Sequence, residues 1–341
     1  MTTAPTAPTA PTAPTAPTAP TILVTGGTGY LATRLIADVL ATGADVRASV
    51  RSLDRADEVR EAVRRAGVDD AGLSFVAASL TADEGWSDAL SGITDVYHVA
   101  SPMIQTADPD EVVVPARDGA LRVLRAARDA GARRVVLTSS FAAVGYSPKP
   151  VRDYDESDWT DPATPGLPAY PLSKAVAERA AWDFVEREGD GLELVVVNPT
   201  WIAGPTLTAS ARSSLALFTG MLDGTMAAVP RQRFGIADVR DVSTAHIAAM
   251  TTPDAAGKRY LVLADGPTMT FLDVANVLRA ELGDLAARVP TDELPGDEPA
   301  PLVIHNDRAK AELGLRPRPA VETIVATAES LRDLGLLAPT S

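Results

Sequence analysis

Tyr170 and Lys174 stand four residues apart in a stretch, residues 169–188, whose composition predicts a helix. This spacing puts a phenol and an ammonium on the same face of a helix. A free phenol keeps its proton at neutral pH, but a nearby ammonium and the positive charge of an oxidised nicotinamide favour the phenolate. Such a tyrosine can donate a proton to a developing alkoxide during carbonyl reduction and accept one during alcohol oxidation.

Two serines supply a third polar group. Ser139 and Ser140 follow residues 134–138, an apolar and β-branched stretch that predicts a buried parallel strand. In an open parallel sheet the ligand lies beyond the carboxyl ends of the strands, so both hydroxyls are expected at that edge. A serine hydroxyl there can polarise a carbonyl oxygen from the side opposite the phenol. Together these groups predict hydride transfer with Tyr170 as proton donor, and Lys174 can also hold the ribose hydroxyls of a cofactor.

A glycine-rich turn near the N-terminus predicts the cofactor site. Residues 21–25 read as a short buried strand, and they lead into Gly-Gly-Thr-Gly-Tyr-Leu-Ala at 26–32, followed by an apolar helical pattern. Gly26 permits the tight turn, Gly29 lets the backbone approach a pyrophosphate, and Ala32 allows close packing of helix on sheet. The free N–H groups of the helix N-terminus favour phosphate. This arrangement predicts a bound dinucleotide.

The residues after the second predicted strand indicate which nicotinamide cofactor binds. That strand covers residues 45–50 and is followed by Arg51, with Ser52 and Arg55 close behind. An enzyme that uses NAD usually has a carboxylate here for the ribose 2′-hydroxyl, whereas an arginine accommodates the 2′-phosphate of NADP. A guanidinium matches phosphate geometry by paired hydrogen bonds. We therefore predict NADP (NADPH), with Arg51 as the main phosphate ligand and Ser52 and Arg55 as helpers; a solvated basic loop is the alternative.

The alternation of strand and helix patterns predicts a Rossmann-type α/β fold, a doubly wound parallel sheet with a smaller C-terminal substrate-binding lobe. On this fold Leu80 lies near the adenine, and Ala100 and Ser101 lie near the nicotinamide ribose. Further strands are expected at residues 73–80, 95–100, 192–197 and 259–263.

Breaks in the pattern predict the domain organisation. Six Thr-Ala-Pro triplets fill residues 3–20, and proline at every third position favours an extended, disordered tail over 1–20. The remaining expected parts are a dinucleotide-binding domain at 21–204 with a return segment at about 235–266, a substrate-binding lobe at 205–234 and 267–341, a partly helical roof of the site at 206–229, and a proline-rich surface loop at 290–301.

Composition excludes several classes of function. The formal net charge is −14 and no basic stripe is visible, which argues against nucleic acid as a partner. The chain has no cysteine, which excludes disulfides and thiolate metal sites, and no metal is expected. No apolar run approaches the ~18 residues of a membrane span and no signal peptide is visible, so a cytoplasmic protein, monomer or homodimer, is expected. The histidines are expected to be hydrogen-bonded structural residues: His98, His246 and His305.

With these features in place, the chain resembles the extended short-chain dehydrogenase/reductase superfamily. Within it the sequence is most similar to the carbonyl reductases grouped with dihydroflavonol 4-reductase and cinnamoyl-CoA reductase. The resemblance spans about residues 21–335. Its marks are residues 24–32, 46–51, 98–103, 170–182, 198–200, 204–205, 238–242 and 245–247.

The resemblance implies roles for single residues. It selects Ser140, the second serine, to complete the catalytic triad with Tyr170 and Lys174. The cofactor-binding positions predicted from the motifs and the resemblance together are Gly26, Thr28, Gly29, Tyr30, Leu31, Arg51, Ser52, Leu80, Val99, Ala100, Ser101, Tyr170, Lys174, Pro199, Thr200, Ile202 and Ser214.

Two departures from the family pattern bear on function. Ser79 replaces the aspartate that commonly follows the third strand, which weakens one adenine contact. Gly145 stands five residues beyond the catalytic serine, where plant flavonoid reductases carry a substrate-binding asparagine, and this argues against a dihydroflavonol substrate.

The predicted function is reversible, NADPH-dependent reduction of a hydrophobic or aromatic aldehyde or ketone. Trp201, Phe141 and Tyr146 lie close in sequence to the catalytic elements and are expected to form an apolar wall. A nucleotide-sugar epimerase or dehydratase on the same fold is the first alternative, but the apolar Phe141-Ala142 after Ser140 and the presence of Arg51 argue against it. A non-catalytic dinucleotide-binding protein is the second alternative; such relatives tend to lose the tyrosine or the lysine.

Overall fold

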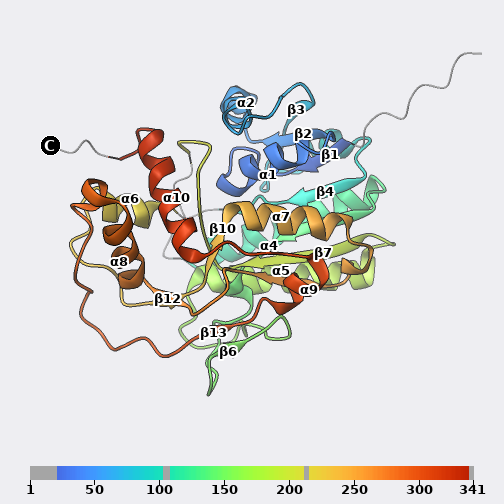
Figure 1. Cartoon of the computed structure of the whole chain (residues 1–341). Helices are drawn as coiled ribbons and strands as arrows, with labels where there is room; N and C mark the ends of the chain where they lie inside the picture. Colours follow the sequence, from blue (N-terminus) through green and yellow to red (C-terminus); the bar gives the residue numbers. More distant parts are fainter. Residues whose placement is uncertain (1–20, 103–107, 211–214, 338–341) are drawn as a thin grey trace, which may run out of the picture.

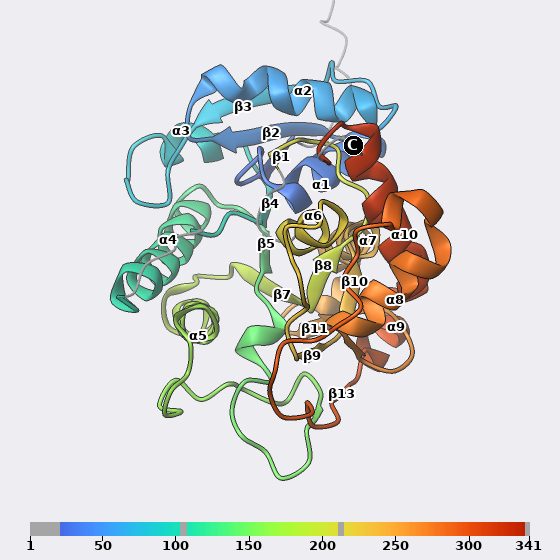
Figure 2. The ribbon, with the colours of Figure 1, turned by 90° about the vertical axis from the view of Figure 1, so that its left-hand side faces the viewer.

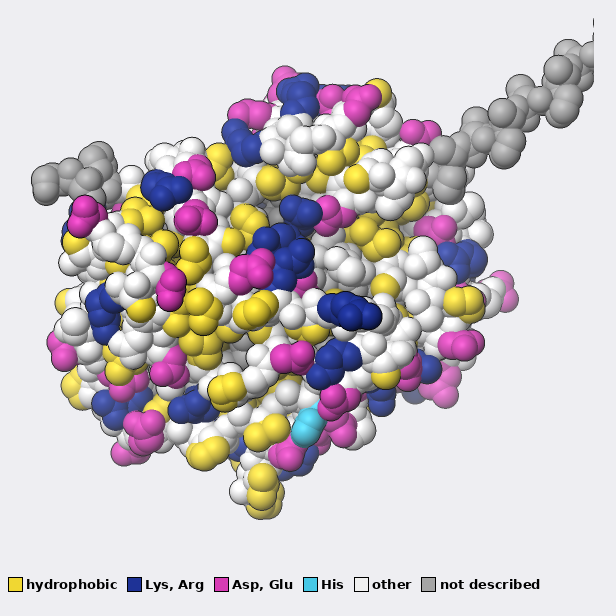
Figure 3. Space-filling model, in the orientation of Figure 1, with side chains coloured by type: hydrophobic (Ala, Val, Ile, Leu, Met, Phe, Trp, Pro, Cys, Tyr) yellow, Lys and Arg dark blue, Asp and Glu magenta, His cyan; other side chains and the backbone are white. Residues whose placement is uncertain are grey.

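The computed structural model describes residues 21–102, 108–210 and 215–337 of the 341-residue chain (Figure 1). The predicted tail at 1–20 and the predicted cofactor residue Ser214 lie outside the described residues. Within these ranges, no helix combines the length and apolar content that crossing a bilayer requires. On the face drawn in Figure 3, basic and acidic side chains are interspersed.

A seven-stranded sheet forms the centre of the molecule, with the spatial order β11-β7-β5-β4-β1-β2-β3. Every pair of neighbours in it is parallel. The order reverses between β1 and β4, which is the point where an open α/β sheet leaves a crevice for a ligand. The doubly wound parallel sheet is as predicted. Its strands are β1 (Thr21–Val24), β2 (Asp45–Val50), β3 (Leu73–Ala77), β4 (Asp95–His98), β5 (Arg134–Thr138), β7 (Glu193–Pro199) and β11 (Arg259–Val262).

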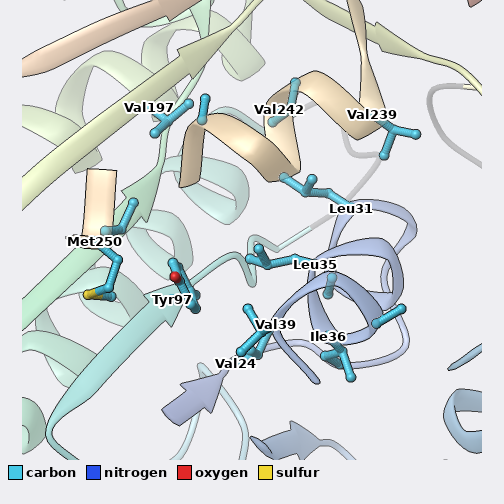
Figure 4. Close-up of a cluster of buried hydrophobic side chains, with 14 of the residues drawn as sticks. Val24, Leu31, Leu35, Ile36, Val39, Tyr97, Val197, Val239, Val242 and Met250 are labelled. Atoms are coloured by element: carbon cyan, nitrogen blue, oxygen red, sulfur yellow. The ribbon is translucent and has the colours of Figure 1, made fainter. Parts of the chain in front are cut away.

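Helices cover both faces of the sheet because successive side chains of a strand point to opposite sides. In β7, Val195 and Val197 enter one hydrophobic core, whereas Leu194 and Val196 enter the other. Figure 2 shows the two helical layers, and Figure 4 shows Val197 in one cluster with side chains of α1 and α7. One layer contains α1 (Tyr30–Leu40), α2 (Ala56–Arg65) and α7 (Val239–Thr251), and the other contains α3 (Trp86–Leu90), α4 (Asp110–Asp129) and α5 (Ala169–Glu188).

Two strands end two or three residues before their predicted ends, each for a local reason. The third was expected to reach residue 80, but it ends at Ala77, which pairs with Val50, the last residue of β2. The fourth was expected to reach residue 100, but it ends at His98. The N–H groups of the next two residues donate to the hydroxyl of Thr25 and so leave the ladder.

A third hydrophobic core lies at the carboxyl edge of the sheet, where Figure 1 shows α6, α8 and α10 side by side. Most residues of this core come from the segments predicted to form the substrate-binding lobe. The segment 267–341 was assigned to the lobe as a whole, but α9 within it packs into the core of the main sheet through Ala309 and Leu313. The helices concerned are α6 (Ala216–Leu222), α8 (Phe271–Glu281), α9 (Asp307–Leu313) and α10 (Ala320–Asp333).

Three two-stranded sheets and four 3-10 turns complete the described chain. The segment 290–301 contains no helix or strand, as predicted for a surface loop. The small sheets are β8 (Trp201–Ala203) with β10 (Ile236–Asp238), β9 (Arg233–Phe234) with β12 (Met269–Thr270), and β6 (Asp153–Tyr154) with β13 (Val303–Ile304). The 3-10 turns are η1 (Leu53–Arg55), η2 (Phe141–Ala143), η3 (Pro253–Ala255) and η4 (Gly283–Ala286).

Candidate active site

A cavity of about 660 Å³ opens at the carboxyl edge of the sheet. It brings together residues from the segments that follow β1 and β4 and from α1, β2, β5, α5 and β7, which are far apart in the sequence. Its wall includes all the predicted site residues except Ser52, which does not line it, and Ser214, which lies outside the described residues. The predicted residues in the wall are Gly26, Thr28, Gly29, Tyr30, Leu31, Arg51, Leu80, Val99, Ala100, Ser101, Ser140, Tyr170, Lys174, Pro199, Thr200 and Ile202.

The glycine turn has the geometry of a phosphate cradle. Gly26 has φ +71°, and a Cβ there would lie 3.0 Å from Ala100, so both the backbone conformation and the close approach require glycine. The N–H of Gly29 donates to the carbonyl of Gly26 at 2.8 Å, which closes the turn directly before α1 begins at Tyr30. Tyr30, Leu31 and Ala32 in the first turn of α1 line the cavity, and the N–H groups of a helix's first turn can bind an anion.

Thr25 is a supporting residue that sequence reasoning missed. Its hydroxyl accepts from the N–H groups of Val99 at 3.1 Å and Ala100 at 3.0 Å, and it lies 2.8 Å from Nδ1 of His98. These contacts fix the loop after β4 against the glycine turn. Ser49 has a similar role, because its hydroxyl accepts from the N–H of Gly26 at 3.2 Å. A threonine or serine in an apolar strand carries no motif, so only the tertiary structure assigns these contacts.

Tyr30 joins the cofactor end of the cavity to the lobe. Its ring lines the cavity and packs against the third core, and its hydroxyl donates to the carbonyl of Gly204 at 2.6 Å. Burial, and secondly the charge of Asp238, raise the pKa of the Tyr30 phenol well above its usual value. The phenol therefore keeps the proton that this bond uses.

Both buried histidines have a structural role, as predicted. Burial lowers the pKa of His98 to about 3, with Lys174 adding to the effect, and burial lowers the pKa of His246 to about 4. The His246 ring lies 2.7 Å from the Thr138 hydroxyl and 2.7 Å from the Val242 carbonyl. Both imidazoles are therefore neutral in the folded chain at physiological pH. His305 lies on the surface, 2.6 Å from Asp153.

This neutrality predicts a loss of stability in weak acid. An unfolded histidine takes up a proton near pH 6.5, whereas the folded His246 does so only near its pKa of about 4. The contribution of the neutral His246 to the unfolding free energy is therefore fully present above pH 6.5 and is lost as the pH falls toward 4. Between pH 6.5 and 5.0 we expect a decrease on the order of 1–2 kcal/mol in unfolding free energy from this residue. Urea denaturation of His246→Gln should show a pH dependence that is shallower by this amount; an unchanged dependence would contradict the assignment.

Arg51 lies at the end of β2, is exposed, and lines the cavity beside the glycine turn. Among the residues that the structure describes, no hydrogen bond or ion pair engages its guanidinium. The two residues predicted to assist Arg51 already have side-chain partners. Ser52 caps η1, where its hydroxyl donates to Asp54 at 3.0 Å and accepts from the Asp54 N–H. Arg55 pairs with Glu58 at 2.7 Å and donates to Ser210 at 3.0 Å, so of these two arginines only Arg51 has a guanidinium without a partner among the described residues.

The three predicted catalytic residues line the cavity together. The Tyr170 side chain is 46% exposed, so its phenol is accessible from the cavity. The Lys174 ammonium lies 5.8 Å from the centre of the Tyr170 ring and donates to the Ser101 hydroxyl at 3.2 Å, on the side predicted for the nicotinamide ribose. The hydroxyl of Ser140 accepts from the N–H of Ala142 at 3.1 Å, which holds it at the start of η2.

Aromatic side chains form the apolar wall, as predicted for Phe141, Tyr146 and Trp201. The roof differs from the prediction, because no described residue of 206–229 lines the cavity. Phe234 takes this place, in edge contact with Trp201 at 4.8 Å between ring centres. The apolar side chains of α6 instead enter the third core, and Trp201 packs against this core. Among the described residues, no group of three or more potential metal ligands occurs.

Several known proteins are similar to this chain in sequence and in fold. The model of the NAD dependent epimerase/dehydratase family matches residues 22–263. Cinnamoyl-CoA reductase 1 of Petunia hybrida is 32% identical over 324 residues, which cover 93% of this chain and 93% of that protein. A putative NADPH-dependent methylglyoxal reductase of Candida albicans is 29% identical over 320 residues, which cover 86% of this chain and 93% of that protein.

Among solved structures, the yeast methylglyoxal/isovaleraldehyde reductase Gre2 complexed with NADPH has a TM-score of 0.80 and 27% identity. The likeness covers 92% of this chain and 99% of that chain, so it includes the lobe as well as the sheet. The chain therefore belongs to the NAD dependent epimerase/dehydratase family, within the extended short-chain dehydrogenases/reductases that its motifs resemble.

Proposed function

We propose that this protein is an NADPH-dependent oxidoreductase that reduces a hydrophobic or aromatic aldehyde or ketone to the alcohol, reversibly. One observation carries the proposal: Tyr170, Lys174 and Ser140 line the same cavity as the glycine turn and Arg51. The relatives named above are reductases of cinnamoyl-CoA and methylglyoxal, which supports a carbonyl as the reacting group.

The residues of the cavity fit NADPH. The tight turn at Gly26 and the start of α1 suit the pyrophosphate, because backbone N–H groups point there and a side chain at Gly26 would collide with Ala100. Arg51 suits the 2′-phosphate. Lys174 and Ser101, already joined at 3.2 Å, suit the hydroxyls of the nicotinamide ribose. When bound, NADPH supplies the hydride for the carbonyl carbon.

The chain's own groups act on the carbonyl oxygen. Tyr170 donates its phenolic proton to this oxygen as negative charge develops on it. The Ser140 hydroxyl donates a hydrogen bond to the same oxygen from the other side, and both donors favour the transition state over the ground state. The Lys174 ammonium stabilises the phenolate that remains. In alcohol oxidation Tyr170 takes the proton back.

The apolar wall separates this function from the nucleotide-sugar epimerases and dehydratases. Phe141 and Ala142, which follow Ser140, are buried and apolar, whereas the dehydratases carry an acidic pair next to the catalytic hydroxyl. Retention of both Tyr170 and Lys174 in the cavity disfavours a non-catalytic dinucleotide-binding protein.

The test is NADPH oxidation, followed at 340 nm, with a panel of aromatic aldehydes, ketones and diketones, a cinnamoyl-CoA thioester, and UDP-glucose. We expect turnover with carbonyls that carry an aromatic or branched apolar group. Conversion of UDP-glucose without net NADPH consumption, detected by product analysis of the same mixtures, would contradict the proposal. Turnover of the thioester but not of free carbonyls would retain the reductase and overturn the substrate class.

Gly145 predicts how this wall responds to a polar substitution. A Cβ at this position would lie 2.2 Å from Cζ of Phe141, so Gly145→Asn must displace the ring from its contacts with Tyr146 and Tyr154. We expect a loss of about 1–3 kcal/mol in unfolding free energy from overpacking. We also expect kcat/KM for aromatic carbonyls to fall about tenfold.

A second variant separates the clash from the lost wall. Phe141→Leu removes the ring atoms that face Gly145, so Phe141→Leu/Gly145→Asn should recover the stability but not the kcat/KM for aromatic carbonyls. Chemical denaturation and steady-state kinetics measure the two effects. Unchanged kinetics in Gly145→Asn would mean that Phe141 does not contact the substrate.

A further inference from the structure

A buried carboxylate lies directly behind the catalytic residues. Glu178 is on α5, one turn after Lys174, and its side chain is fully buried. One carboxylate oxygen accepts from the Ser139 hydroxyl at 2.6 Å and from the Asn198 amide at 2.7 Å. The other accepts from Nε of Arg259 at 2.5 Å and from the Trp182 indole at 3.3 Å. Glu178 thereby ties the catalytic helix to residues at the ends of β5 and β7 and to β11.

Asn198 connects this carboxylate to the catalytic serine. Its Nδ2 donates both to Glu178 and, at 3.2 Å, to the backbone carbonyl of Ser140. The carboxylate requires a donor, so the amide cannot rotate by 180°, even though Oδ1 of Asn198 has no partner among the described residues. The Asn198 side chain is fully buried and does not line the cavity.

Stability alone is a weak reason for such a network. Burying an ion pair such as Glu178–Arg259 costs about as much desolvation as the attraction returns, and an apolar replacement is often neutral or better. Here Oδ1 of Asn198 and Nη2 of Arg259 also lack hydrogen-bond partners among the described residues, which adds to the desolvation cost of the network. The network instead fixes a geometry. The Glu178 carboxylate accepts a hydrogen bond from the Asn198 amide and so orients it, and the amide in turn holds the backbone carbonyl of Ser140.

We propose that Asn198, oriented by Glu178, is a positioning residue that sets the Ser140 hydroxyl against the Tyr170 phenol. The inference rests on the proposed function, because Ser140 must act on the substrate oxygen for its position to matter. Tyr170, Lys174 and Glu178 occupy successive turns of α5, so the contact to Ser140 fixes the register between this helix and the serine loop. Neither Asn198 nor Glu178 touches the substrate.

The test is a double-mutant cycle between Asn198→Leu and Ser140→Ala in the full chain. If Asn198 acts through the Ser140 hydroxyl, Asn198→Leu should lower kcat about 10- to 100-fold in the parent but less than about threefold in the Ser140→Ala background. The KM for NADPH should stay unchanged. The unfolding midpoint should fall by the same amount in both backgrounds, because the carbonyl of residue 140 is present in each.

Asn306 provides a matched control. It is a buried asparagine whose Nδ2 also joins a backbone carbonyl, that of Leu263 at 2.9 Å, to a carboxylate, that of Asp265 at 3.1 Å, but it does not line the cavity. Asn306→Leu should lower stability and leave kcat unchanged. If Asn198→Leu does not fold, Asn198→Ser retains a hydroxyl that is too short to reach both partners, and the same cycle applies.

Two results would overturn the proposal, and they differ from each other. Losses that multiply in the double variant, with Ser140→Ala itself impaired, would overturn the positioning role and leave the proposed function intact. Wild-type turnover in Ser140→Ala would overturn the proposed function, and with it the reason for positioning.

Discussion

Replacing Tyr170 by phenylalanine is expected to lower kcat by about 10²–10⁴-fold, the usual range for loss of a positioned general acid. The ring packs in the same place without its hydroxyl, and Lys174 keeps its bond to Ser101, so NADPH should bind nearly as before. Steady-state kinetics with one carbonyl substrate measure the first effect. Quenching of protein fluorescence by NADPH measures the second.

Tyr146 supplies a matched control for this experiment. It lines the same cavity and is 49% exposed, close to the 46% of Tyr170. Partial burial, and secondly the charge of Tyr170, raise the pKa of the Tyr146 phenol, so this phenol keeps its proton at neutral pH. Tyr146→Phe should therefore change kcat less than about threefold. Wild-type turnover in Tyr170→Phe, or equal losses in both variants, would contradict the assigned proton donor.

The sequence placed the residues proposed for the catalytic and cofactor ends together in one site because their signals are local. Tyr170 and Lys174 are one helical turn apart, and the glycines at 26 and 29 belong to one turn between a strand and a helix. The helix bounds 169–188 and the strand bounds 134–138 agree with the structure for the same reason: each is a continuous pattern in a single segment.

The roof of the cavity could not be predicted in this way, because it depends on pairing between distant segments. Trp201 and Phe234 meet because the N–H of Trp201 donates to the carbonyl of Gly235 at 3.1 Å, where β8 pairs with β10. Three-residue strands of this kind leave almost no periodicity in a sequence. The apolar pattern at 206–229 was visible, but it is satisfied by packing in the lobe.

Hydrogen bonds from side chains to nearby turns and loops account for two contacts that the sequence did not reveal. Ser52 has the residue type of a phosphate ligand, yet its hydroxyl is used within its own turn, as serine hydroxyls near turn starts commonly are. Thr25 looks like one more strand residue, yet its hydroxyl ends β4 and holds the loop at Val99 and Ala100. In both cases the residue type was visible and the direction of its side chain was not.

The second large effect is expected at Arg51, on which the choice of cofactor depends. A hydrogen bond between charged partners contributes about 1.5–3 kcal/mol. Arg51 is exposed, and solvent weakens the contact, so Arg51→Ala should weaken NADPH binding by about 10- to 100-fold. NADH has no 2′-phosphate, and its binding should scarcely change. Arg51→Asp should go further, because the carboxylate repels the phosphate and accepts from the ribose hydroxyls.

Arg55 is the control for these variants, because it is four residues away but already paired with Glu58 and bonded to Ser210. Arg55→Ala should leave the ratio of kcat/KM for NADPH and NADH within about threefold of wild type, whereas Arg51→Asp should shift it toward NADH. The difference between NADPH and NADH should shrink at high ionic strength, because salt screens a contact near solvent. If wild-type enzyme uses both cofactors equally, or if Arg51→Asp leaves the ratio unmoved, Arg51 is a solvated loop charge and the selection of NADPH must come from another part of the cavity.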